Sequence, residues 1–323
     1  MTGVSTAPPL RVALFGFGVV GEGVYQRLVR DPRFAVVGVA CRDPERHVRR
    51  GAPAALFTRD PRAFADYDVL VEAVGGVAPA REVVLAALAR GADVVTANKT
   101  LVARRFEELH EASAKARRRL LYSAAVGGGV PMLETVDAAA REGAISRIEA
   151  VVNGTTNFVL DRIGAGLSRD EAVRLAQEAG FAEADPSADI DGLDAAEKIS
   201  LLARRAFGVG VDPDSVERDA LGSVSEAEIV AAASSGAPYK QVAAAYRKAA
   251  GVALAVRLVR APATSPLARP RREENVLVIE REFGQPIILH GKGAGRDPTA
   301  DSVVADLDVV AKERALERFA APA

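Results

Sequence analysis

Five carboxylates and a lysine lie close together in the sequence between residues 180 and 198. The acidic residues are Glu183, Asp185, Asp189, Asp191 and Asp194. Carboxylates before a helix usually act as caps and dipole partners, but that role does not easily account for all five. Asp194 and Lys198 are four residues apart, so they share one face of the helix expected over Leu193–Phe207. Such a pair is either a surface salt bridge or, if the ammonium group is partly desolvated, a proton donor.

A glycine-rich loop, Gly16-Phe17-Gly18-Val19-Val20-Gly21, is the second chemical signature. It directly follows an apolar run, Arg11–Phe15, and opens a helix expected over Val19–Arg30. In that setting the first glycine makes the turn, the second lets the backbone approach a pyrophosphate, and the third allows close helix packing. The amides at the helix N-terminus then face the phosphates. The expected cofactor-binding residues of this loop are Gly16, Gly18, Val19, Val20 and Gly21.

Two further positions bear on the cofactor. After the run that ends at Ala40, Arg42 could bind the 2′-phosphate of NADP and Asp43 the 2′-hydroxyl of NAD. Both dinucleotides stay open, with NADP slightly favoured. Lys99, in Thr96-Ala97-Asn98-Lys99, follows another expected strand, at the edge where open α/β sheets bind ligands. It either faces the nicotinamide and the reacting carbon or is merely a solvated residue at a helix start.

Short apolar runs alternate with helical stretches between Leu10 and Tyr122, and this alternation positions the residues described above. The pattern predicts an α/β fold: a Rossmann-type, doubly wound parallel sheet with helices on both faces. Strands buried on both faces should be continuously apolar, as these are. The expected strands are Arg11–Phe15, Ala35–Ala40, Val69–Val74, Asp93–Thr96 and Leu120–Tyr122, and the helices are Val19–Arg30, Pro79–Arg90 and Leu101–Ala116.

A second, α+β domain is expected after Gly127–Gly129, where the pattern changes. The expected helices are Val130–Arg141, Thr156–Ile163, Ser168–Ala179, Leu193–Phe207 and Thr299–Glu317. The expected strands are Ile145–Val152, Asn275–Glu282 and Pro286–His290. Two stretches, Val224–Pro238 and Ala261–Arg272, are expected to form a surface helix and a loop.

Composition excludes several classes of protein. The chain has 323 residues, about twice the ~150 of a typical domain, so two domains are expected. Its 42 basic and 43 acidic residues suit neither a nucleic acid nor an anionic membrane as partner, and no run approaches the ~18 apolar residues of a membrane span. A single cysteine, Cys41, and three scattered histidines predict no disulfide and no zinc site. Met1–Pro9 is expected to be a disordered leader on a cytoplasmic protein.

The chain resembles the homoserine dehydrogenase family from Gly16 to its end. The motifs that carry the resemblance are Gly16–Gly21, Thr96–Lys99, Val126-Gly127-Gly128-Gly129-Val130-Pro131, Asn153-Gly154-Thr155-Thr156-Asn157, the acidic stretch ending in Lys198, Gly291–Gly295 and Thr299–Leu307. The resemblance implies NAD(P)-linked interconversion of L-homoserine and L-aspartate 4-semialdehyde, a step toward threonine, methionine and isoleucine.

The resemblance also implies residue roles. Lys198 would donate the proton to the aldehyde oxygen, Asp194 would orient the substrate, and Lys99 would share the acid/base duty. The expected substrate-binding residues are Glu183 and Asp189, which would hold the ammonium group, and Gly154 and Thr155, which would line the pocket. A zwitterion with a carbonyl needs such carboxylates, together with one donor aimed at the oxygen where negative charge develops.

The domain organisation and assembly follow from the same resemblance. The expected NAD(P)-binding domain comprises residues 1–128 completed by 292–323, and the substrate-binding and dimerisation domain comprises 129–291. Gly293 and its neighbouring glycines would return the chain to the cofactor domain and close over the dinucleotide. A homodimer is expected. Because the chain stops soon after its terminal helix, feedback by threonine through a C-terminal regulatory domain is not expected.

A monovalent cation, Na⁺, is the remaining implication of the family. Backbone carbonyls would hold it, and the corresponding residues here are Ser123, Val126, Gly128 and Val130. Ser123 departs from the family, which often has glutamate at this position, but a site made of backbone oxygens could survive that change.

Two other functions stay open. A related amino-acid dehydrogenase could use the same fold on another small acid such as aspartate. The arrangement from Glu183 to Lys198 instead suits an alcohol/aldehyde pair that carries an α-ammonium group. A catalytically silent dinucleotide sensor would tolerate the loss of Lys99 and Lys198, and both are present.

Overall fold

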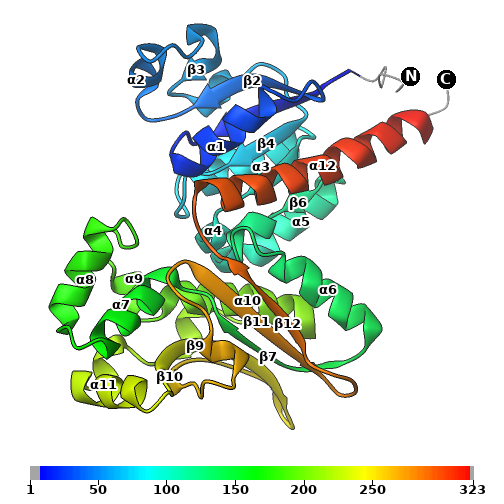
Figure 1. Ribbon diagram of the computed structural model, residues 1–323. Coiled ribbons are helices and arrows are strands. Elements are labelled where there is room, and N and C mark those ends of the chain that lie inside the picture. Colours follow the sequence, from blue (N-terminus) through cyan, green and yellow to red (C-terminus); the bar gives the residue numbers. More distant parts are fainter. Residues whose placement is uncertain (1–7, 321–323) are drawn as a thin grey trace, which may run out of the picture. The chain divides into compact units, whose positions relative to one another are not determined.

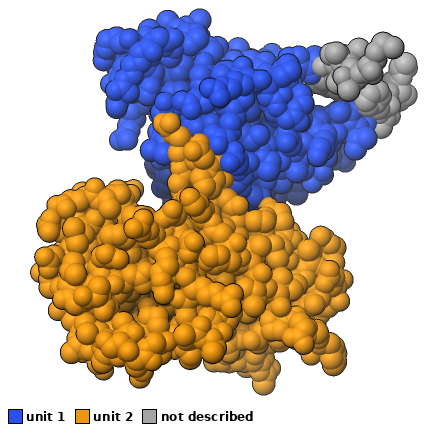
Figure 2. Space-filling model, viewed as in Figure 1, with its two compact units in different colours: residues 1–125, 299–323 blue, residues 126–298 orange. Residues whose placement is uncertain are grey.

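A computed structural model describes residues 8–320 of the chain (Figure 1). The leader expected at Met1–Pro9 lies almost wholly outside these residues. The chain divides into two compact units, which Figure 2 colours separately. Unit 1 is Met1–Ala125 with Thr299–Ala323, and unit 2 is Val126–Pro298. Within the described residues, no helix combines the length and the apolarity needed to cross a bilayer.

The described residues of unit 1 form a parallel sheet of six strands in the order β3-β2-β1-β4-β5-β6. The strands are β1 (Leu10–Phe15), β2 (Phe34–Ala40), β3 (Phe57–Thr58), β4 (Val69–Glu72), β5 (Asp93–Thr96) and β6 (Leu120–Leu121). The predicted α/β fold with a doubly wound sheet is confirmed. Strand order reverses between β1 and β4, so the carboxyl ends of these two strands mark the switch point where such sheets bind ligands.

Helices cover both faces of this sheet (Figure 1). They are α1 (Val19–Leu28), α2 (Pro44–Val48), α3 (Ala80–Ala89), α4 (Lys99–Arg104), α5 (Phe106–Ala116) and α12 (Arg296–Ala320). Apolar side chains of α1 and α12 form one core with those of β1, and α3 packs against α5. The single helix predicted over Leu101–Ala116 is wrong, because Arg105 leaves the helical region (φ −130°, ψ 28°) and separates α4 from α5.

Polar contacts fasten α12 to the sheet of unit 1. The Arg314 guanidinium binds the Asp93 carboxylate (2.5 Å) and donates to the carbonyls of Asp68 (2.8 Å) and Gly91 (3.2 Å). Farther along the helix, Asp306 accepts hydrogen bonds from the hydroxyl (2.6 Å) and the amide (3.0 Å) of Ser123. The C-terminal segment is therefore a structural part of unit 1.

Unit 2, which is described throughout, is built on a mixed sheet in the order β12-β11-β7-β9-β10-β8. Its strands are β7 (Ile145–Val151), β8 (Glu217–Arg218), β9 (Tyr239–Lys248), β10 (Gly251–Arg260), β11 (Glu274–Arg281) and β12 (Ile287–Lys292). Its helices are α6 (Met132–Glu142), α7 (Gly154–Gly164), α8 (Arg169–Glu178), α9 (Ser187–Ile190), α10 (Leu193–Phe207) and α11 (Glu226–Ser234). Helix α10 packs on β7, β9 and β10, and α7 packs against α8 and α11.

The hairpin β9–β10 is absent from the sequence predictions. Its strands contain Ala243-Ala244-Ala245 and further alanines, and alanine favours helix. Tertiary packing overrides that preference here, because β9 lies inside the sheet between β7 and β10. Small side chains such as Ala243 and Ala245, which are fully buried there, let helix α10 lie against the strands.

Replacing Arg314 by leucine should destabilise unit 1 by roughly 3 kcal/mol, because the Asp93 carboxylate would stay buried without its cation. Thermal unfolding followed by circular dichroism measures this loss. Glu317→Gln on the same helix is the matched control, since it removes only a long pair (3.4 Å) from an exposed glutamate to Arg118 and should have almost no effect. Equal unfolding midpoints for Arg314→Leu and the control would contradict the anchoring role of Arg314.

Candidate active site

Polar residues from three elements of unit 2 converge just beyond the end of β7. Lys198 on α10 donates from Nζ to Oδ2 of Asp194 (2.8 Å) and to the carbonyl oxygen of Val152 (2.7 Å). The Lys198 and Asp194 side chains are 14% and 10% exposed. They lie on one face of α10, as their four-residue spacing predicts. The pair is therefore nearly buried, which is the condition for the proton-donor alternative rather than for a solvated salt bridge.

Asn153, between β7 and α7, joins this pair to a second carboxylate. Its Nδ2 donates both to Oδ1 of Asp189 (2.7 Å) and to Oδ2 of Asp194 (2.8 Å). Its Oδ1 accepts from the amide of Thr156 (2.8 Å) and so caps α7. No individual role is predicted for Asn153 from the sequence. The available signal was an asparagine between an expected strand and an expected helix, which is the composition of an N-cap.

Asp189 lies on the short helix α9, and its carboxylate is close to a second carboxylate, that of Asp194. Burial and then the neighbouring Asp194 carboxylate raise the pKa of Asp189, while Asn153 and Lys198 oppose that change. Its backbone carbonyl accepts from Thr156 Oγ1 (3.0 Å) and Gln241 Nε2 (3.1 Å), which fixes α9 in place. With both carboxylates ionised, two negative charges face one ammonium group. The cluster formed by Asn153, Asp189, Asp194 and Lys198 is therefore suited to an additional cation.

The other predicted substrate residues differ in their surroundings. Thr155 is buried and donates from Oγ1 to the carbonyl of Phe181 (2.6 Å). Gly154 begins α7, where a Cβ would lie 3.2 Å from the Arg272 carbonyl oxygen, so the backbones approach closely. Glu183 is exposed, and among the described contacts its carboxylate does not join the cluster. Asp185 and Asp191 are exposed as well, so two of the five carboxylates are brought together.

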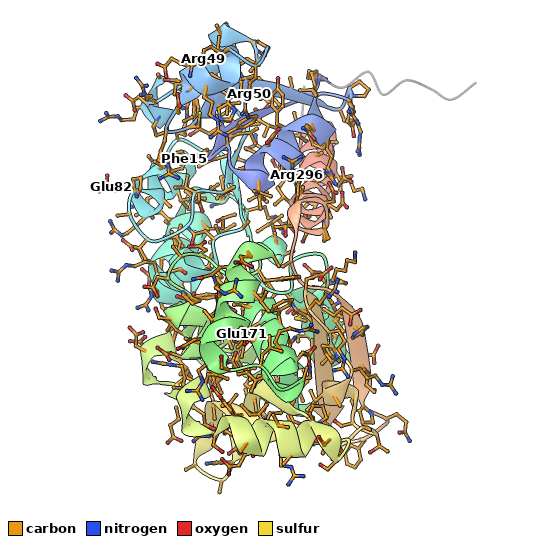
Figure 3. The ribbon with its side chains drawn as sticks, turned by 60° about the vertical axis from the view of Figure 1, so that its left-hand side comes forward. Phe15, Arg49, Arg50, Glu82, Glu171 and Arg296 are labelled. Carbon is orange, nitrogen blue, oxygen red and sulfur yellow. The ribbon has the colours of Figure 1, made fainter. Side chains whose placement is uncertain are left out.

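A groove of about 1640 Å³ opens at the carboxyl ends of β1, β2 and β4 in unit 1. Phe15 and Glu82, two of its lining residues from β1 and α3, lie on the same side of unit 1 in Figure 3. At Gly16 (φ +105°) a Cβ would lie 2.6 Å from the backbone of Ala73, and at Gly21 one would lie 2.1 Å from the Gly16 carbonyl oxygen. Gly18 has no atom within 4 Å of that position. Packing thus requires the first and third glycines, whereas the second leaves space beside the groove.

Several arginines line this groove. They are Arg42, Arg46, Arg59, Arg62 and Arg90. The acidic candidate Asp43 is already engaged, because its carboxylate accepts from the Arg46 amide (3.2 Å) and caps α2. Burial raises the pKa of the partly buried Cys41 thiol, which keeps it protonated and poorly nucleophilic.

The remaining predicted residues lie at the ends of other elements. Lys99 is the first residue of α4, and Asn98 caps that helix by accepting from the Leu101 amide (3.1 Å). Val126, Gly128 and Val130 belong to unit 2 and Ser123 to unit 1. A Cβ at Gly293 would lie 1.8 Å from Nδ2 of Asn275, so packing inside unit 2 already requires glycine there. The described residues contain no group of three or more His, Cys, Asp or Glu side chains arranged to hold a metal ion.

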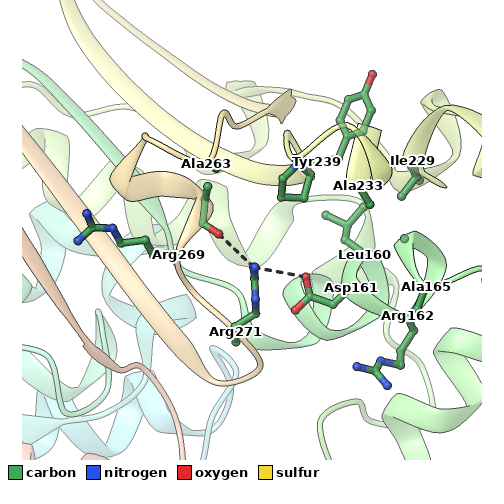
Figure 4. Close-up of a pocket in the computed structure, with 14 residues that line it drawn as sticks. Leu160, Asp161, Arg162, Ala165, Ile229, Ala233, Tyr239, Ala263, Arg269 and Arg271 are labelled. Carbon is green, nitrogen blue, oxygen red and sulfur yellow. Dashed lines mark hydrogen bonds and ion pairs between the residues drawn. The ribbon is translucent and has the colours of Figure 1, made fainter. Parts of the chain in front are cut away.

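A second cavity, of about 570 Å³, lies between α7, α11 and the loop before β11 (Figure 4). Figure 4 shows the Arg271 guanidinium directed at Asp161, 3.8 Å away. The same guanidinium donates to the Ala268 carbonyl (3.0 Å). The fully buried Lys240 also donates to Asp161 (3.3 Å), and to the Pro270 carbonyl (2.8 Å). Two cations thus share one carboxylate, and the lining contains none of the predicted site residues.

Family models match both units of the chain. The model described as homoserine dehydrogenase matches residues 131–307, and the model described as the NAD binding domain of homoserine dehydrogenase matches residues 16–123. The homoserine dehydrogenase of Synechocystis sp. is 36% identical over 317 residues, which are 92% of this chain and 72% of that protein. The Corynebacterium glutamicum enzyme is 35% identical over 321 residues, 94% of this chain and 72% of that protein.

A solved structure agrees with these matches. The crystal structure of a homoserine dehydrogenase from Thiobacillus denitrificans superposes with a TM-score of 0.89 at 31% sequence identity. The alignment covers 97% of this chain and 76% of that one.

Replacing Asn153 by alanine should raise the pKa of Asp189 further and destabilise unit 2, because the two carboxylates lose their shared donor. In the folded state the pKa of Asp189 already lies above its ordinary value, so folding favours the neutral form. Its contribution to stability is present at low pH and is lost as the pH rises through the folded pKa. The loss of thermal stability should therefore be larger at pH 8 than at pH 5.

Asn157→Ala is the matched control for this measurement. Asn157 is buried on the same helix and donates to the Glu274 carbonyl (3.2 Å), with no carboxylate among its described partners. Its loss should lower the unfolding temperature equally at both pH values. A pH-independent effect of Asn153→Ala would contradict the charge-bridging role of Asn153.

Proposed function

Because the chain belongs to the homoserine dehydrogenase family, we propose here which of its residues bind the substrate and cofactor and which move the proton. The family's reaction is the NAD(P)-dependent interconversion of L-homoserine and L-aspartate 4-semialdehyde, toward threonine, methionine and isoleucine. The observation that best supports this choice of catalytic residues is the nearly buried pair of Asp194 and Lys198. The proposed cofactor domain, residues 1–128 with 292–323, contains unit 1 and a few flanking residues of unit 2, and the proposed substrate domain, residues 129–291, is the rest of unit 2.

The substrate binds at the carboxylate cluster of unit 2. Its ammonium group pairs with Asp189 and Glu183, and the excess negative charge of the cluster supports this assignment. Gly154 and Thr155 line the pocket at the N-terminus of α7, where unsatisfied amides and the helix dipole favour the substrate carboxylate. Asp194 orients the substrate beside Lys198.

Lys198 moves the proton. An ammonium group has three N–H donors, and Asp194 and Val152 account for two of them in the described contacts. The third reaches the aldehyde oxygen and stabilises the negative charge that develops there, then delivers the proton to form the alcohol. In the oxidation direction the neutral amine accepts the hydroxyl proton. The bound nicotinamide dinucleotide supplies or accepts the hydride. Lys99, at the start of α4, shares the acid/base duty.

The dinucleotide lies along the groove of unit 1. Amides after Gly16, at Gly18, Val19, Val20 and Gly21, bind the pyrophosphate, and Gly293 is a further cofactor-binding residue. NADP is the preferred form, with Arg42 on its 2′-phosphate. Two observations support this preference: several guanidinium groups line the groove, and capping of α2 occupies the acidic alternative, Asp43.

Three further assignments rest on the family. The protein acts as a cytoplasmic homodimer whose interface lies in the substrate domain. A monovalent cation such as Na⁺ is held by backbone carbonyls of Ser123, Val126, Gly128 and Val130. Positive φ angles at Gly127 and Gly128 (91° and 58°) produce a turn of the backbone in this segment. Carbonyl oxygens are suitable ligands for a hard cation.

Lys198→Met should lower kcat for L-homoserine oxidation by roughly 10²- to 10⁴-fold, because the positioned acid/base group is lost. NADPH affinity, measured by fluorescence titration, should stay near that of the wild type. Lys240→Met is the matched control: it removes another buried lysine paired with an aspartate in unit 2, so it should lower stability but not kcat. Turnover of Lys198→Met within a few fold of the wild type would remove Lys198 from the mechanism.

Arg42→Ala should raise KM for NADP by roughly 10- to 100-fold and leave KM for NAD nearly unchanged, because a charge-assisted contact to the 2′-phosphate is worth about 1.5–3 kcal/mol. Initial rates with L-homoserine and each cofactor measure this, and L-aspartate serves as the substrate control. Arg50→Ala, a charge-matched change on the exposed surface outside the groove, should alter neither constant. Equal changes for both cofactors in Arg42→Ala would contradict the 2′-phosphate assignment.

A further inference from the structure

Glu72, the last residue of β4, is a fully buried carboxylate that the proposed mechanism does not use. The described contacts bring it only neutral donors. Thr96 Oγ1 donates to Oε2 (2.5 Å), and the Val74 amide donates to Oε1 (2.8 Å). Burial raises the pKa of Glu72, and these hydrogen bonds offset only part of that change. A buried ionisable group without a cation is costly, and apolar replacements are often as stable, so stability alone gives no reason for glutamate at this position.

The contacts of Glu72 join two segments at the carboxyl edge of the sheet. On one side Oε1 accepts from the amides of Val74 (2.8 Å) and Gly75 (3.4 Å), which fixes the loop after β4. On the other side it accepts from Nδ2 of Asn98 (3.4 Å), the residue that caps α4. Asn98 Nδ2 also donates to the Gly76 carbonyl (2.7 Å), which closes the network.

Both segments are next to the places where the cofactor and the proton relay are assigned. The backbone of Ala73, directly after Glu72, lies against Gly16 so closely that a Cβ there would be 2.6 Å away. Val74 and Gly75 line the groove of unit 1. Lys99 is the first residue of the helix that Asn98 caps. One carboxylate thus sets the conformation of the loop beside the glycine turn and the position from which Lys99 extends.

We propose that Glu72 is a positioning residue for hydride transfer, which holds the loop 73–76 and the start of α4 in the arrangement that the bound nicotinamide dinucleotide requires. This inference rests on the proposed placement of the cofactor along the groove. Its physical basis is preorganisation: four donors converge on one rigid acceptor, so the segments are ordered before the cofactor arrives. Glu72 itself need not touch substrate or cofactor.

Asp93 provides a matched comparison on the neighbouring strand. In the register of β4 with β5, Val69 pairs with Asp93 and Glu72 pairs with Thr96. Asp93 is therefore at the amino end of β5 and Glu72 at the carboxyl end of β4, so the two buried carboxylates lie at opposite ends of these parallel strands. Asp93 binds Arg314 (2.5 Å) and the Arg119 amide (2.8 Å), and it anchors α12 away from the groove. Its loss should therefore affect stability without affecting catalysis.

The experiment compares Glu72→Met, Glu72→Gln and Asp93→Leu in the full-length enzyme. For each variant the unfolding temperature, the NADPH dissociation constant, kcat and KM for L-homoserine, and the primary deuterium isotope effect with L-homoserine deuterated at C4 are measured. Glu72→Met should lower kcat roughly 10- to 100-fold, weaken NADPH binding and increase the isotope effect, because misplacement slows the hydride step. KM for L-homoserine should change little.

Glu72→Gln should restore kcat to near the wild-type value, because an amide still accepts from Val74 and can donate to Thr96 Oγ1. Asp93→Leu should lower the unfolding temperature with normal kcat and isotope effect. If Glu72→Met shows that same pattern, the positioning role is overturned. If Glu72→Met does not fold, Thr96→Val, which removes one donor to the carboxylate, must show the same kinetic changes in weaker form. Wild-type enzyme that fails to bind NADPH would instead contradict the cofactor assignment.

Discussion

The structure depends most on how unit 2 holds two carboxylates and one ammonium group together in a largely buried cluster. Lys198 is held between the Asp194 carboxylate and the Val152 carbonyl, and Asn153 places the Asp189 carboxylate beside them. Each contact requires a specific backbone feature: the end of β7, the cap of α7, and the first turns of α10. In the proposed mechanism the unbalanced negative charge of this largely buried cluster favours binding of an ammonium group, and the fixed lysine presents a proton donor to the reacting oxygen.

Both units contain an asparagine that caps a helix and also binds buried carboxylates. In each, an asparagine follows a buried strand and caps the next helix through its side-chain oxygen, Asn98 for α4 and Asn153 for α7. In each, the amide nitrogen of that asparagine donates to buried carboxylates, Glu72 in one unit and the Asp189–Asp194 pair in the other. An asparagine is suited to this because it offers an acceptor and two donors on one rigid group. Aspartate could cap the helix but could not hold the carboxylate.

Sequence patterns predict the features that depend on neighbouring residues. The helix Leu193–Phe207 and the shared face of Asp194 and Lys198 follow from local spacing, and so does the glycine turn after β1. The bridge made by Asn153 could not be predicted, because its partners are 36 and 41 residues away. Glu72 and Thr96 are likewise 24 residues apart and meet only because β4 pairs with β5. The alanine-rich hairpin β9–β10 was missed because its strands are stabilised by the surrounding sheet rather than by their own composition.

The most direct test of the account is a crystal structure of the enzyme with a nicotinamide dinucleotide and L-homoserine bound. We expect Nζ of Lys198 to lie within about 2.6–3.2 Å of the substrate hydroxyl oxygen while keeping Asp194 as a partner. We also expect the substrate ammonium group to contact Asp189. A hydroxyl oxygen bonded to water or to another side chain, with Lys198 contacting only Asp194 and Val152, would contradict the proposed mechanism.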